Sequence, residues 1–104
     1  MGNFDFESGK RFMQDGDLVE GIRSFLASLD QDPANVEAYL ELFKAYELAW
    51  RESGDTMVLD QMRKVAVAGL KRGPDAAQRR FLEEGLDRTD KLIIEAGEGG
   101  QEGE

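Results

Sequence analysis

The sequence predicts an all-α fold, with about five helices that form antiparallel hairpins. Two features of the 104-residue chain favour this fold. Apolar residues recur at steps of three and four along most of the chain, which is the period of a helix with one buried face. Breaks at Gly16, Asp32-Pro33, Gly54 and Gly73-Pro74 divide this pattern into five segments, since such residues end helices and form turns.

The first two segments are expected to pack as a hairpin. Gly9 precedes Phe12 by three positions, and Gly21 precedes Phe25 by four. A glycine on the buried face of a helix lets its neighbour approach closely, and a larger residue there overpacks the contact. Asp17 is expected to cap the second helix, because its carboxylate can accept from free N–H groups in the first turn.

Three further helices are expected after Pro33. Asn35 is predicted to cap a longer helix from Val36 to Ser53, and the next helix runs from Met57 to about Arg72. The last helix is predicted over residues 75 to about 96. Residues 97–104, GEGGQEGE, are acidic, rich in glycine and without an apolar side chain, so we expect a disordered tail.

The spacing of these residues resembles the tetratricopeptide repeat (TPR), a helical hairpin of about 34 residues. A first repeat, about 2–35, is carried by Gly9, Phe12, Gly21, Phe25 and Pro33. The start of a second repeat is carried by Tyr39, Leu42, Phe43 and Tyr46. Phe12 and Tyr46 are 34 positions apart, which is the period of the family.

The second repeat, about 36–74, is irregular. Its first helix carries about one extra turn, and Met62 and Ala66 stand where the family has an alanine and a phenylalanine. The resemblance implies a single domain over residues 1–96, with TPR-like superhelical stacking and residues of about 75–96 as a capping helix.

Composition argues against most catalytic chemistry. The chain has no histidine and no cysteine, which removes the commonest general base, the commonest transition-metal ligand and the most reactive nucleophile. We therefore expect no enzyme, no cofactor and no metal site. No apolar stretch approaches the ~20 residues of a membrane span, and the amino-terminal residues lack a signal-peptide pattern. These features predict a cytoplasmic protein without a membrane partner.

The net charge of −9 is unevenly distributed. Residues 1–55 have a net charge of −7, residues 56–80 of +4 and residues 81–104 of −6. An acidic surface repels nucleic acid and anionic membranes. Only the basic middle block offers an exception, and it has no interleaved aromatic residues for base stacking, which disfavours nucleic acid as a partner.

The TPR resemblance implies a binding groove lined mainly by the first helix of each repeat. At the positions that line this groove in the family, the present sequence has Phe6, Lys10, Met13, Gln14, Leu40, Glu41, Lys44, Glu47 and Leu48. The apolar members would suit a peptide, and Lys10 and Lys44 would suit a carboxylate. Alternatively, Phe6 and Met13 pack beneath the amino terminus and the lysines are solvated. The lysine–asparagine clamp of TPR co-chaperones is not reproduced, because Phe6 and Glu41 occupy two of its positions.

Two secondary interface candidates lie outside this groove. Trp50 is either an interface anchor or a residue packed against a neighbouring helix. The basic block is either a solvated face, a nucleic-acid surface or a patch that meets the acidic half of another copy, and it consists of Arg63, Lys64, Lys71, Arg72, Arg79 and Arg80.

These observations predict a protein–protein interaction adaptor or scaffold, whose groove binds a peptide or helix of another protein. A more specific form of this prediction is a chaperone-like role. The protein would then mask an amphipathic segment of one partner, as small TPR-like secretion chaperones do. One alternative is a structural homo-oligomer assembled through charge-complementary surfaces. The other is a nucleic-acid-associated protein that uses the basic residues of the 63–80 segment.

Overall fold

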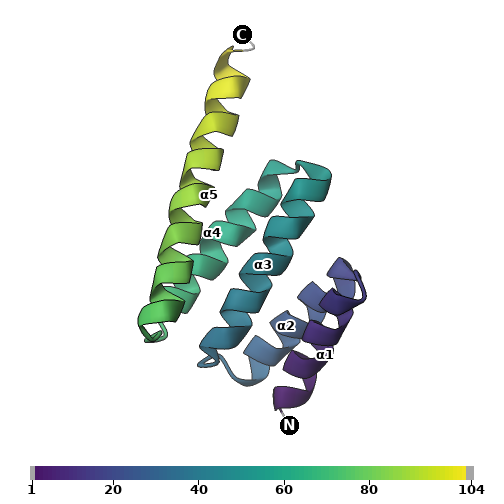
Figure 1. The fold of residues 1–104 in the computed structure, drawn as a ribbon. Helices are drawn as coiled ribbons and strands as arrows, with labels where there is room; N and C mark the ends of the chain where they lie inside the picture. The colour runs from purple at the N-terminus through teal and green to yellow at the C-terminus, as the bar shows by residue number, and fades with distance from the viewer. Residues whose placement is uncertain (1, 103–104) are drawn as a thin grey trace.

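The computed structural model describes the backbone of residues 2–102 and the side chains of residues 5–97. In the described chain there are five helices and no strand, which confirms the predicted all-α class (Figure 1). No described helix combines the length and the apolar content that a membrane crossing requires. The helices are α1 (Gly2–Gln14), α2 (Leu18–Gln31), α3 (Val36–Ser53), α4 (Thr56–Leu70) and α5 (Ala76–Glu102).

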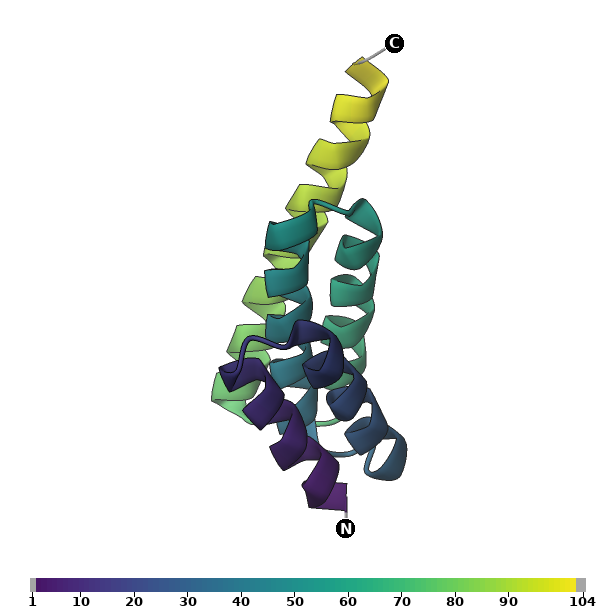
Figure 2. The same ribbon diagram turned by 90° about the vertical axis from the view of Figure 1, so that its right-hand side faces the viewer.

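Helix α3 is the centre of the molecule, because it contacts each of the other four helices. α1 and α2 form one antiparallel hairpin, α3 and α4 form a second, and α5 packs along α4 (Figures 1 and 2). α1 and α5 also touch α3 from its two sides. The first, third and fifth helices therefore lie next to one another, with α3 in the middle.

Aspartate side chains cap the starts of α2, α4 and α5, and the cap at Asp17 was predicted. Asp17 accepts a hydrogen bond from the Glu20 amide at 3.3 Å, and Asp55 accepts one from the Met57 amide at 2.9 Å. At the start of α5, Asp75 and Gln78 each bond the other's backbone N–H, as in a capping box. The prediction for Asn35 is wrong in one respect: it holds the N-cap position of α3, but its side chain makes no capping hydrogen bond.

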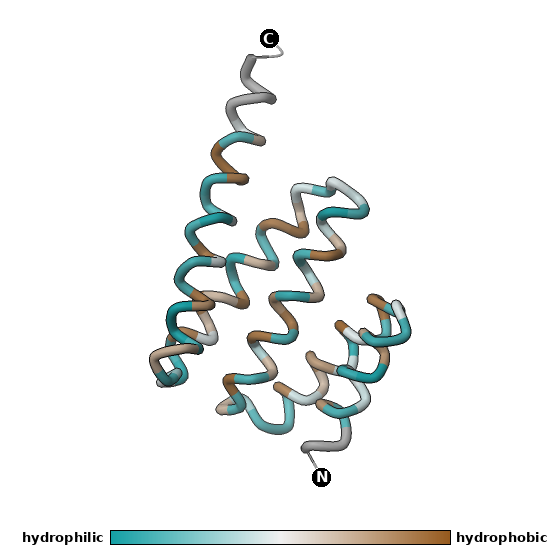
Figure 3. The backbone as a smooth tube through the Cα atoms, in the orientation of Figure 1, coloured by the Kyte–Doolittle hydropathy of each residue, from teal (hydrophilic) through white to brown (hydrophobic). Residues whose placement is uncertain are grey.

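The core confirms the close helix approaches predicted at glycine. Phe25 and Phe43 are fully buried aromatic residues of this core. A Cβ atom on Gly9 would lie 2.6 Å from Phe25 Cε1, and one on Gly21 would lie 2.8 Å from the sulfur of Met13. Figure 3 shows hydrophobic and hydrophilic residues alternating along the helices, as expected where each helix buries one face and solvates the other.

The end of α5 differs from the sequence prediction. The helix runs to Glu102, past the expected end at Ala96, and extends beyond the α3–α4 turn in both views (Figures 1 and 2). Helix thus occupies residues 97–102, where a disordered tail was predicted, and residues 103 and 104 lie outside the described part. Much of the described outer surface of α5 is exposed and charged.

Candidate functional site

Six of the nine predicted groove residues line one groove between α1 and α3, with a volume of about 390 Å³. We call it the α1–α3 groove. Leu48 is 42% exposed and Met13 is half-buried, so both offer apolar surface. The complete lining consists of Lys10, Met13, Gln14, Glu41, Lys44 and Leu48.

Each lysine of the groove belongs to a small unit that the chain repeats after 34 residues. Lys10 Nζ lies 3.6 Å from a Glu7 carboxylate oxygen, and Lys44 Nζ lies 3.2 Å from one of Glu41. Each ammonium also lies over an aromatic ring: Lys10 Nζ is 5.0 Å from the ring centroid of Phe6. The two helices therefore carry the same lysine–glutamate pair, of which both lysines but only one glutamate, Glu41, line the groove.

These ion pairs leave the lysines available to a ligand. The Lys10 and Lys44 side chains are 41% and 49% exposed, and exposed pairs of this kind contribute only ~0.2–1 kcal/mol to stability. A carboxylate of a bound segment can replace the intramolecular glutamate at little cost. The ring under each ammonium adds attraction of ~0.5–1 kcal/mol at an exposed site, and it limits where the lysine rests.

Helix α5 extends this surface beyond α3. Lys44 Nζ lies 5.6 Å from the ring centroid of Phe81, which lines a second groove of about 510 Å³ together with Arg80. Neither α5 residue was predicted as part of the binding groove, because α5 carries little of the repeat motif. Their adjacency to Lys44 follows only from the packing of α5 beside α3.

Three predicted groove residues do not line the α1–α3 groove. Phe6 and Leu40 are buried, each 9% exposed, so the prediction that they present a binding surface is corrected. Phe6 packs on Phe25 of α2, with ring centroids 6.0 Å apart, so it belongs to the core. Glu47 is half-buried, and its carboxylate binds Arg88 of α5 at 3.3 Å and Arg51 at 3.6 Å. It joins α3 to α5.

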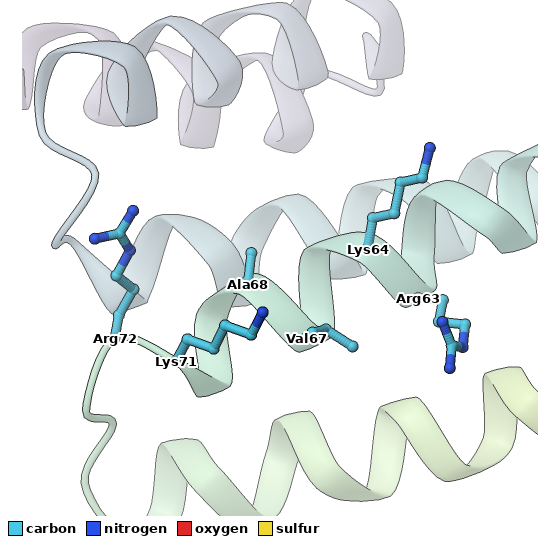
Figure 4. A pocket seen from close by; sticks show the side chains of 6 residues that line it. All are labelled: Arg63, Lys64, Val67, Ala68, Lys71 and Arg72. Atoms are coloured by element: carbon cyan, nitrogen blue, oxygen red, sulfur yellow. The ribbon is translucent and has the colours of Figure 1, made fainter.

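The predicted basic block is split between two helices. Four of its residues line a groove of about 490 Å³ on α4, which we call the α4 groove (Figure 4). Its apolar lining is Val67 and Ala68, and its basic lining is Arg63, Lys64, Lys71 and Arg72. The remaining two basic residues, Arg79 and Arg80, are exposed on α5.

Two of the four cations in the α4 groove have acidic neighbours. Arg63 Nε lies 3.0 Å from an Asp90 carboxylate oxygen, and Lys64 Nζ lies 3.2 Å from one of Asp60. Among the described side chains, neither Lys71 nor Arg72 forms an ion pair. The positive potential of the groove is therefore strongest at the end of α4.

Trp50 packs against the core cluster and is half-buried. This position favours the packing interpretation over the interface anchor. Within the described part of the chain, no group of three or more acidic side chains is placed to hold a metal ion.

Comparison of the chain with protein-family models, with curated proteins and with solved structures finds no match. The TPR assignment therefore stays a prediction from residue spacing.

Proposed function

We propose that the protein is a binding adaptor, and that the α1–α3 groove holds a short segment of another protein. The observation that carries this proposal is the shared groove: six residues that the TPR resemblance implies as groove residues, three from α1 and three from α3, line one depression. We propose binding rather than catalysis because the chain has neither histidine nor cysteine. The absence of cysteine also suits the reducing cytoplasm, where we propose that it acts.

The chemistry of the groove defines the ligand. Met13 and Leu48 supply apolar surface from opposite sides, which favours an apolar side chain as the anchor of the bound segment. The ammonium groups of Lys10 and Lys44 favour a carboxylate beside that anchor. The bound segment is therefore a short peptide or one helical turn with an apolar residue next to an acidic one.

A chaperone-like version of the proposal follows from the same surface. An amphipathic helix has apolar residues on one face and acidic residues beside them, and the groove offers complementary chemistry to both. Binding would cover the apolar face of the partner until its own assembly site is available.

Selection from a displayed peptide library tests the proposal. The wild-type protein is expected to enrich peptides that combine an apolar and an acidic residue. Leu48→Glu places a charge on the apolar wall of the groove, and we expect the dissociation constant of the enriched peptides to rise about tenfold or more. Because Leu48 is 42% exposed, the substitution leaves the core intact.

Val19→Glu is the matched control. Val19 is an exposed apolar residue of α2 that does not line the groove, with 65% of its surface accessible. We expect this variant to bind the enriched peptides as the wild type does. If Leu48→Glu and Val19→Glu bind the same peptides with equal affinity, the groove is not the binding site.

A further inference from the structure

The α4 groove is a second, basic depression that the proposed adaptor function does not use. It lies on α4, whereas the α1–α3 groove is lined by α1 and α3. Figure 4 shows Lys64 on α4, with Lys71 and Arg72 just after the end of that helix, around Ala68. A small apolar floor bordered by cations suits a slender acidic segment with small side chains, because bulky residues would keep its carboxylates away from the cations.

The acidic residues of the amino-terminal half are largely engaged within their own hairpin. Glu7 and Glu20 pair with lysine or arginine three residues on. Asp17 caps α2, and Asp32 accepts the Ala34 amide at 3.3 Å. Each of these acidic residues also has a bulky or cyclic neighbour in the sequence, so none belongs to a slender acidic segment of the kind that the α4 groove suits.

The carboxyl-terminal segment has the complementary composition. After Lys91 the sequence contains four glutamates, at positions 95, 98, 102 and 104, and no lysine or arginine. The residues between and beside the last three glutamates are glycine and one glutamine. This segment is both acidic and slender, as the α4 groove requires.

The segment cannot reach the α4 groove of its own chain. α5 begins at Ala76, four residues after Arg72, and leads away from that end of α4 for 27 residues (Figure 1). At 1.5 Å per residue the helix is about 40 Å long, so its far end lies at the opposite end of the molecule. For this segment to fill the groove, it must therefore come from another copy of the chain.

We propose that the α4 groove binds the acidic segment of residues 95–104 from a second copy of the chain. The contact is heterologous, since it joins one end of a molecule to the opposite end of the next. Repetition of the contact gives a head-to-tail assembly that grows with protein concentration. The interaction is mainly ionic, so it weakens as salt shortens the Debye length from about 30 Å at 0.01 M to about 3 Å at 1 M.

Charge-swap variants, studied by sedimentation velocity at low salt, test the proposal. The first variant, Lys71→Glu/Arg72→Glu, makes this end of the groove acidic. The second variant, Glu98→Lys/Glu102→Lys/Glu104→Lys, makes the carboxyl-terminal segment basic. We expect the wild type to gain mass with concentration and each variant alone to associate about tenfold more weakly or worse.

Recombining the reversed charges separates the proposed contact from a loss of folding. An equimolar mixture of the two variants presents each groove with a segment of opposite charge, so the mixture is expected to associate. A single chain that carries all five substitutions is also expected to associate. Recovery in the mixture requires that both variants are folded, and recovery in the single chain requires that this chain is folded.

Lys10→Glu/Lys44→Glu is the control, because it changes the α1–α3 groove and is expected to leave self-association at the wild-type level. The proposal is overturned if the wild type stays monomeric at every concentration at low salt. It is equally overturned if the segment variant associates as the wild type does, or if the mixture of variants shows no gain in mass over either variant alone.

Discussion

The ring of Phe43 lies against the backbone of Gly85, so closely that a Cβ atom on Gly85 would stand 2.8 Å from Phe43 Cζ. It holds α5 close to α3. In the first hairpin the glycine is on α1, where Gly9 makes room for Phe25 of α2. Between α3 and α5, the large residue is on α3 and the glycine that accommodates it is on α5. A buried phenylalanine ring against a glycine of another helix therefore occurs at two helix contacts.

Gly85→Ala is expected to lower the free energy of unfolding by ~1–3 kcal/mol, because the added methyl group overpacks the contact with Phe43. Urea unfolding followed by circular dichroism measures the change. Gly97→Ala in the same helix is the control, since a Cβ atom there meets nothing within 4 Å. That variant should be neutral or slightly more stable, as alanine is the better helix former. Equal effects at the two sites would contradict the packing described.

Much of the fold follows from local sequence features. The Gly16 and Gly54 turns, the aspartate caps and the apolar stripes predict four of the five helices closely, because each depends on residues within one or two turns. The pairing of Phe43 with Gly85 depends on the packing of α5 against α3, and no local pattern reports it. The end of α5 was missed for a related reason: a glycine-rich composition disfavours helix, yet the structure continues the helix to Glu102.

Phe25→Ala is expected to destabilise the protein by ~3–5 kcal/mol, because Phe25 is fully buried and contacts both Gly9 and the ring of Phe6. A loss of this size is a large part of the ~5–15 kcal/mol typical of a domain. Leu26→Ala, at the neighbouring exposed position, should change stability by no more than ~0.5 kcal/mol. Thermal unfolding of both variants measures the contrast. A similar melting temperature for the two would show that α1 does not pack on Phe25.

Two buried hydroxyl groups are expected to respond in opposite ways to removal. Ser28 Oγ is buried without a hydrogen-bond partner among the described residues, whereas Thr89 Oγ1 donates to the Gly85 carbonyl at 2.7 Å. Ser28→Ala removes an unsatisfied polar group, so stability should stay the same or rise by ~1 kcal/mol. Thr89→Val removes a hydrogen bond and should cost ~0.5–1.5 kcal/mol. Denaturant unfolding distinguishes them, and a destabilised Ser28→Ala would indicate a partner for that hydroxyl.

Burial raises the pKa of Tyr46 above its ordinary value of 10.0. The tyrosine is neutral in both states below that pH. As the pH rises above this value, Tyr46 ionises first in the unfolded chain. The free energy of unfolding therefore falls as the pH rises from the pKa of Tyr46 in the unfolded chain to its higher pKa in the folded protein. Tyr46→Phe is expected to reduce this alkaline loss of stability, measured by urea unfolding at about pH 8 and about pH 11. An unchanged pH dependence in the variant would show that Tyr46 ionises equally in both states.

The candidate site was predicted in part. Lys10 and Lys44 were found because they occupy equivalent positions in two helices, and a period of 34 residues is visible in the sequence. Phe6 and Leu40 were assigned to the surface by position alone, and their burial depends on the neighbouring helices. The role of Phe81 under Lys44 was not predicted, because α5 carries no recognisable repeat from which its position relative to α3 could be inferred.

The most direct test of the binding proposal is the mapping of amide chemical shifts by NMR while a peptide enriched from the display library is added. The proposal predicts the largest shifts on α1 and α3, at Lys10, Gln14, Lys44 and Leu48, with the Lys64–Arg72 segment of α4 unchanged. Shifts concentrated in that α4 segment, or spread evenly over the protein, would contradict a binding site in the α1–α3 groove.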